Sequence, residues 1–104
     1  MENKGKATAE EIKALKAKHG EIHEIVSEKE GIKHYTYVKK PDLAIISAAA
    51  SYAESDPVKS GEIMFNSTRV AGSDEVITDA EMKLGVIQYI GGIFKIVEAQ
   101  GKKL

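Results

Sequence analysis

The sequence contains no cysteine, which excludes disulfides, thiolate zinc sites and cysteine nucleophiles together. It also lacks an excess of one charge, because 15 basic and 16 acidic side chains leave a formal net charge of −1. No overall field therefore draws the chain to nucleic acid or to an anionic membrane surface. The absence of cysteine fits a reducing compartment.

Long apolar segments are missing as well. Residues 1–18 are polar and charged where a secretory signal would need an apolar core. The most apolar run, residues 84–97, contains Gln88 and Lys95 and is shorter than the roughly 20 residues that span a bilayer. We therefore expect a cytoplasmic protein without a membrane segment.

The composition that is present suits one folded domain. The 104 residues are 42% hydrophobic and 30% charged, a balance that favours a folded, soluble chain over disorder. A chain of this length buries roughly 60 to 70% of its unfolded surface around one core. We predict a single, mainly helical α+β domain over residues 1–104, with residues 1–7 flexible.

The first part of the domain is predicted to hold a helix and a β-hairpin. Thr8 and Glu11 have the spacing of a capping box, which predicts a helix over residues 8–19. Residues 21–39 contain two segments rich in β-branched and aromatic side chains. The polar stretch over residues 27–31 separates them, a pattern typical of a hairpin. Both faces of the second strand carry mixed side chains, so either face could be the buried one.

Residues 41–100 are predicted as the helical part. Pro41 and Pro57 each stand where a helix begins, because proline fixes φ near the helical value and needs no backbone donor there. The helix after Pro41 consists mainly of small apolar residues, and we expect it at the centre of the fold. The predicted order is thus a helix, a β-hairpin and three further helices.

The last of these helices is predicted over residues 79–100, begun by a capping box of Thr78 and Glu81. It carries two apolar stripes. One stripe consists of Met82, Val86, Tyr89, Ile93 and Ile96, and the other of Leu84, Ile87, Ile90, Phe94 and Val97. A helix that is apolar on two faces has two surfaces to cover. One can be the core of the domain, and the other can be a second subunit or a partner.

No motif for catalysis or ligand binding is present. His19 and His23 are four residues apart, but Gly20 and the strand pattern that follows argue against a shared helical face for a metal ion. The sequence has neither a G-x-S-x-G elbow nor a phosphate-binding loop. We therefore assign no catalytic, cofactor-binding or metal-binding residue and expect no enzyme activity.

Several short segments follow one another in a distinctive order from about residue 39 to residue 104. They are Lys40-Pro41-Asp42, Asp56-Pro57, Gly61-Glu62-Ile63-Met64-Phe65-Asn66, Gly72-Ser73-Asp74-Glu75 and Gly101-Lys102-Lys103-Leu104. In order and spacing, this part of the chain resembles the small tail assembly chaperones of long-tailed bacteriophages and prophages.

The resemblance implies a non-catalytic protein of the host bacterial cytoplasm. Such a protein binds the tape-measure protein, keeps its long apolar helix soluble and helps to recruit tail-tube subunits. The alternative is a structural tail or connector component that is retained in the virion. For the contact with a partner or a second copy we predict Met82, Val86, Tyr89, Ile93 and Phe94. The competing interpretation is that these side chains form the internal core.

Overall fold

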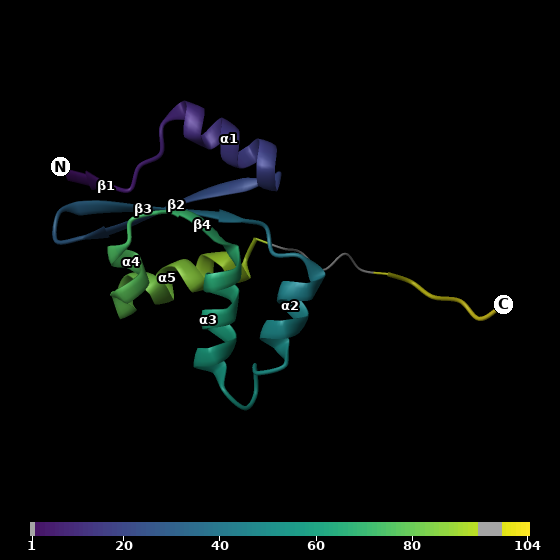
Figure 1. The fold of residues 1–104 in the computed structure, drawn as a ribbon. Helices are drawn as coiled ribbons and strands as arrows, with labels where there is room; N and C mark the ends of the chain where they lie inside the picture. The colour runs from purple at the N-terminus through teal and green to yellow at the C-terminus, as the bar shows by residue number, and fades with distance from the viewer. Residues whose placement is uncertain (1, 94–98) are drawn as a thin grey trace.

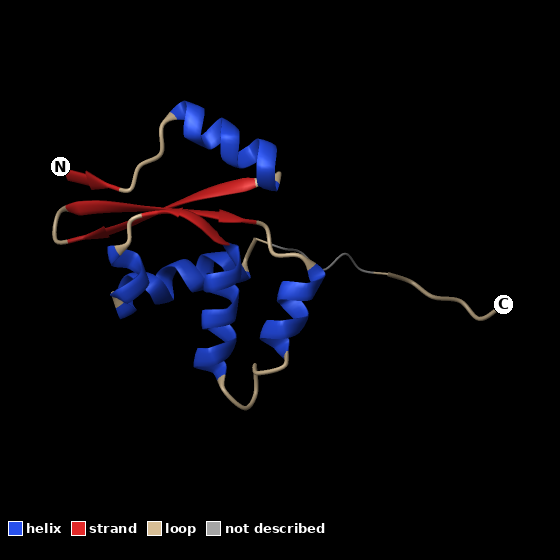
Figure 2. Cartoon of the chain, viewed as in Figure 1, coloured by secondary structure: helices blue, strands red, loops and turns tan. Residues whose placement is uncertain are grey.

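The computed structural model describes residues 2–93 and 99–104 and combines helices with a four-stranded mixed sheet (Figures 1 and 2). In chain order the elements are β1 (Glu2–Lys4), α1 (Ala9–His19), β2 (Ile22–Lys29), β3 (Ile32–Lys39), α2 (Leu43–Ala50), α3 (Pro57–Thr68), β4 (Arg69–Gly72), α4 (Glu75–Thr78) and α5 (Ala80–Gly91). The prediction of an α+β domain is confirmed. The predicted order is confirmed in part, since β1, β4 and α4 are additional to it.

Strand β3 is the centre of the sheet. One of its edges pairs antiparallel with β2 along the whole strand. The other edge is shared, because β1 pairs parallel with the first part of β3 and β4 pairs antiparallel with the last part. The N-terminal segment predicted as flexible over residues 1–7 therefore contributes a strand. It is too short to show a sequence pattern, and its position depends on the free edge of β3.

The hairpin between β2 and β3 is tighter than predicted. Strand β2 continues to Lys29, and the turn consists of Glu30 and Gly31, with φ of 54° and 76°. Positive φ at both positions of a two-residue turn matches the right-handed twist of the flanking strands. The polar stretch over residues 27–31 is thus mostly strand, and its polarity reflects solvent exposure at the edge of the sheet.

Both faces of β3 are buried, which explains its mixed side-chain pattern. The main core lies between the sheet and the helices α3, α4 and α5 (Figure 1). Its fully or nearly buried members are Ile25, Val38, Phe65, Val76, Met82, Val86 and Ile90. On the opposite face, where α1 lies, Tyr35 and Tyr37 are buried, and the backbone N–H of Ala7 donates to the Tyr37 hydroxyl at 3.0 Å. Burial raises the pKa of the Tyr37 phenol.

Most predicted helix starts are confirmed. Thr8 and Glu11 form the expected capping box at the start of α1. The start of α5 differs, because Asp79 is its N-cap and accepts a hydrogen bond from the backbone of Met82. The hydroxyl of Thr78, predicted to cap this helix, instead donates to the carbonyl of Glu75 within α4.

Helix α2 lies beside α3 (Figure 1) and is not the central helix that we predicted. Ala49 is its one buried residue, and Leu43 at its start is 80% exposed. The Ser60 hydroxyl on α3 donates to the carbonyl of Ala49 at 2.7 Å. Small side chains bury little apolar area, so a helix made of them gains less from a central position than α5 does.

The last helix is shorter than predicted. Helix α5 ends at Gly91, Gly92 is its C-cap, and residues 99–104 contain neither helix nor strand. The prediction of a helix to residue 100 is therefore wrong at its end, while residues 94–98 lie outside the described residues. Each of the paired glycines costs about 1 kcal/mol in a helix relative to alanine. Among the described residues, no atom lies within 4 Å of the Cβ position of Gly91, so none of them packs there to offset this cost.

A buried hydroxyl in β3 leads to a stability prediction. Thr36 is fully buried, and its hydroxyl has no hydrogen-bond partner within residues 2–93 and 99–104. Valine has nearly the same shape and removes the unsatisfied polar group. We therefore expect Thr36→Val to raise the free energy of unfolding by about 1 kcal/mol in urea denaturation.

Thr68 supplies the matched control for this substitution. It is equally buried, but its hydroxyl donates to the carbonyl of Met64 at 2.8 Å. We expect Thr68→Val to leave the free energy of unfolding unchanged or to lower it. An equal loss of stability in both variants would contradict the prediction.

Candidate functional site

Helix α5 carries the candidate site, because it is apolar on both sides of its buried stripe. Met82, Val86 and Ile90 recur every four residues and are buried in the core. Leu84 and Tyr89 lie on either side of this stripe and remain 60% and 45% exposed. The helix therefore contributes to the core and also to two surface grooves.

The first groove lies between α3 and α5, and we call it the α3–α5 groove. It encloses about 260 Å³. Its lining residues are Pro57, Val58, Gly61, Glu62, Ala80, Lys83, Leu84 and Ile87. Val58 is 71% exposed and, with Leu84, presents an apolar surface to solvent. The charged lining residues Glu62 and Lys83 pair with each other at 3.9 Å, which leaves the groove without net charge.

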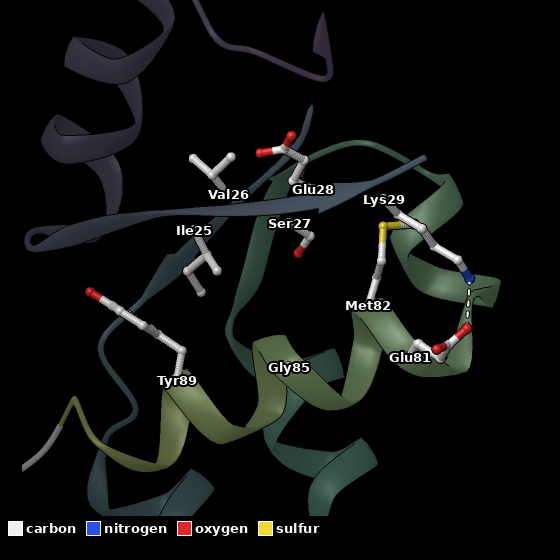
Figure 3. A pocket seen from close by; sticks show the side chains of 9 residues that line it. All are labelled: Ile25, Val26, Ser27, Glu28, Lys29, Glu81, Met82, Gly85 and Tyr89. Carbon is white, nitrogen blue, oxygen red and sulfur yellow. Dashed lines mark hydrogen bonds and ion pairs between the residues drawn. The ribbon is translucent and has the colours of Figure 1, made fainter. Parts of the chain in front are cut away.

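The second groove lies between α5 and β2, and we call it the α5–β2 groove. It encloses about 450 Å³ and is lined from both elements (Figure 3). The side chains of Ile25 and Ser27 point from β2 toward α5, while those of Val26 and Glu28 point away. Gly85 faces the middle of this groove, where a Cβ would meet no atom of the described residues within 4 Å. The groove is therefore open at its centre.

Charged groups close one end of the α5–β2 groove. The Lys29 ammonium donates to Asp79 at 2.6 Å and to Glu81 at 2.9 Å. The hydrogen bond to Asp79, followed by that to Glu81, raises the pKa of Lys29. The same bond from Lys29 lowers the pKa of Asp79. This cluster joins the end of β2 to the start of α5.

A histidine closes the other end. Nδ1 of His23 lies 3.0 Å from the hydroxyl of Tyr89, and Nε2 lies 2.6 Å from a carboxylate oxygen of Glu21. A further hollow of about 340 Å³ continues past Tyr89, between His23 and Ile93. The contacts at both ends hold β2 against α5 on either side of the open centre of the groove.

The five predicted binding residues have different environments. Met82 and Val86 are 7% and 0% exposed and belong to the core, and Met82 also lines the α5–β2 groove. Tyr89 lines the α5–β2 groove, and Ile93 lines the adjoining hollow while packing partly against the core. Phe94 lies outside the described residues.

Two exposed apolar residues of the α3–α5 groove were not among these predictions. Val58 and Leu84 come together from different helices in the α3–α5 groove. Leu84 belongs to the second apolar stripe of α5, which was visible in the sequence. The contribution of Val58 depends on the crossing of α3 and α5, where a Cβ on Gly61 would approach Ile87 to 3.2 Å.

A serine, a histidine and a glutamate meet where β3 passes α4. His34 Nδ1 lies 2.9 Å from the Ser73 hydroxyl, and His34 Nε2 lies 3.9 Å from Glu75. His34 and Ser73 are only 3% and 5% exposed, so the hydroxyl is not presented to a substrate. Glu75 also accepts a hydrogen bond from Lys4, which lowers the pKa of Glu75. The cluster joins β1, β3 and α4, a structural role.

Within residues 2–93 and 99–104, no three His, Asp or Glu side chains gather as a metal ion would require. His19 ends α1 and His23 lies in β2, so they share no helical face. None of the described helices combines the length and apolarity needed to cross a membrane.

No protein-family model and no curated protein matches this chain. Its fold is similar to that of a solved structure, the uncharacterised protein rbstp2171 from Bacillus stearothermophilus. The two chains are 20% identical, and the TM-score is 0.65 over 88% of this chain and 99% of that chain. The likeness shows that the two proteins share a fold.

Proposed function

We propose that this chain is a non-catalytic tail assembly chaperone or adaptor of a long-tailed bacteriophage. It binds the tape-measure protein and assists assembly of the tail tube in the cytoplasm of the host. The observation that carries the proposal is the α3–α5 groove, where Val58 and Leu84 expose apolar side chains on a folded domain. Contiguous exposed apolar surface is a feature of sites where proteins bind one another.

The chemistry of the groove favours a helical partner. An amphipathic helix places apolar side chains every three or four residues into a groove between helices. The ion pair of Glu62 and Lys83 leaves the groove without net charge, so an apolar stripe meets no unpaired charge there. With about 260 Å³, the groove holds a few side chains and does not enclose a helix. Several copies of this protein could therefore cover successive stretches of one long tape-measure helix.

Co-expression with helical fragments of the tape-measure protein tests the proposal. We expect the wild-type chain to keep these fragments in the soluble fraction and to co-purify with them. Leu84→Asp places a charge in the α3–α5 groove at a side chain that is 60% exposed, so the fold should persist. We expect this variant to bind the fragments at least about tenfold more weakly, the effect of losing one central apolar contact.

Leu43 gives a matched control, since it is 80% exposed on α2 and outside the groove. Leu43→Asp should bind like the wild type. Unchanged binding by Leu84→Asp, or an equal loss in Leu43→Asp, would exclude the groove as the binding surface. Mass spectrometry of purified virions distinguishes the structural alternative, since a chaperone is absent from the particle and a tail or connector component is present.

A further inference from the structure

The outer edge of β2 is unpaired along all eight residues of the strand, within the part of the chain that the structure describes. From this edge we infer that the protein forms a two-fold dimer, in which the β2 strands of two copies pair antiparallel and join their sheets. The inference concerns self-association and is independent of the tail partner proposed above. It is supported by the backbone of β2, by its charges and by the α5–β2 groove.

The backbone of β2 is free to pair on this side. Lys29 and Ile32 flank the two-residue turn and bond to each other, and the bonds to β3 then alternate along the antiparallel pair. Every second residue of β2 bonds to β3, and the N–H and C=O groups of the residues between them point to the free edge. The residues with free groups are Ile22, Glu24, Val26 and Glu28. Natural edge strands are commonly blunted by a bulge, a proline or charged side chains. Strand β2 contains no proline and pairs with β3 without a bulge, and its charges limit the registers in which it can pair.

Two registers pair the longest stretch of β2, those with the two-fold axis at Ile25 or at Val26, and the charges on β2 favour the first. A two-fold axis through Ile25 sets Glu24 of one copy opposite Val26 of the other, and Ile22 opposite Glu28. Moving the axis to Glu24 sets this glutamate opposite itself, and moving it to Val26 sets Glu24 opposite Glu28. Like charges directly opposite each other destabilise an antiparallel pair. The register centred on Ile25 avoids both repulsions.

The α5–β2 groove has room for the second copy. Helix α5 runs antiparallel to β2, since Glu81 at its start contacts Lys29 and Tyr89 near its end contacts His23. A two-fold axis perpendicular to the sheet therefore brings the α5 helices of the two copies toward each other, antiparallel, on the face of the sheet that α5 covers. This places Tyr89 of one copy near Gly85 of the other, where the missing side chain leaves open space. The interface is isologous, so this contact occurs twice.

Sedimentation equilibrium of the full chain, from micromolar to millimolar concentration, measures the dimer dissociation constant. Val26 is 46% exposed, so charged substitutions there should leave the fold intact. Val26→Lys places a lysine opposite Glu24 of the other copy at two symmetric positions. We expect it to tighten the dimer by about threefold to tenfold, and Val26→Glu to weaken it by a similar factor. Circular dichroism verifies that both variants fold.

Hydrogen exchange tests the same edge in the wild-type protein. The amides of Glu24, Val26 and Glu28 should become protected as the dimer forms, while that of Ser27, bonded to β3, is protected at every concentration. Val26→Pro removes one outward N–H and should give a monomer. If that variant does not fold, the exchange pattern and the two charge variants still test whether β2 forms the interface.

Three results would overturn the inference. One is a monomer at all concentrations with rapid exchange along the outer edge of β2, which leaves the edge for a strand of another protein. Another is a shift of the same sign in Val26→Lys and Val26→Glu, which contradicts the register. The third is a folded Val26→Pro variant that dimerises like the wild type, which places the interface elsewhere.

Discussion

Gly72→Ala is expected to lower the free energy of unfolding by about 4 kcal/mol or more, a large part of the stability of a domain of this size. A Cβ at Gly72 would lie 2.3 Å from the carbonyl oxygen of Tyr35 and 2.8 Å from the Cα of Thr36. Both are backbone atoms in the central strand of the sheet, which cannot move without breaking its pairing. The φ of Gly72 is +129°, a conformation that suits glycine. Urea denaturation followed by circular dichroism measures the loss.

Gly31→Ala is a control that separates the two causes of the expected stability loss at Gly72, the steric contact with β3 and the backbone conformation. Gly31 has a φ of +76° in the hairpin turn, and a Cβ there would meet no atom of the described residues within 4 Å. This control bears the cost of a left-handed alanine alone, about 1 kcal/mol. If Gly72→Ala costs no more than Gly31→Ala, the close approach of Gly72 to β3 does not determine its stability.

Phe65→Ala is expected to cost about 3 to 5 kcal/mol, the range for removing a buried aromatic side chain from a core. Phe65 lies on α3, is 1% exposed and belongs to the same cluster as Val38, Val86 and Ile90. It therefore joins α3 to both the sheet and α5. The loss should appear as a lower urea midpoint with little change in the slope of the transition.

Val58→Ala is the control on the same helix. Val58 is 71% exposed, so we expect a change in the free energy of unfolding within about 0.5 kcal/mol. According to the proposed function, this variant should instead weaken the binding of tape-measure fragments. A loss of stability in Val58→Ala that equals the loss in Phe65→Ala would contradict the assignment of core and groove on α3.

The helices and strands that could be predicted from the sequence are those formed by interactions between residues close together in the chain. Thr8 and Glu11 satisfy each other's backbone donors, and the Asp56 side chain caps α3 just before Pro57. The hairpin of β2 and β3 follows from alternating strand residues around Gly31. In each case the interacting groups are close along the chain, so their spacing is visible in the sequence.

The short strands and the end of α5 could not be predicted in this way. Strands β1 and β4 have three and four residues, too few for a periodic pattern, and each depends on an edge of β3 that is distant in sequence. The apolar pattern continues beyond Gly91, but the helix does not, because paired glycines weaken it. Apolar periodicity alone therefore overestimated the helix.

The apolar residues of the last helix are enough to show that it has more than one apolar face. Which of these side chains are buried depends on packing, since α3 and the sheet cover Met82, Val86 and Ile90 while Leu84 and Tyr89 remain exposed. Hydrophobicity belongs to a side chain, whereas burial depends on the elements packed against it. The two grooves beside α5 are therefore properties of the fold, built from residues that lie far apart in the chain.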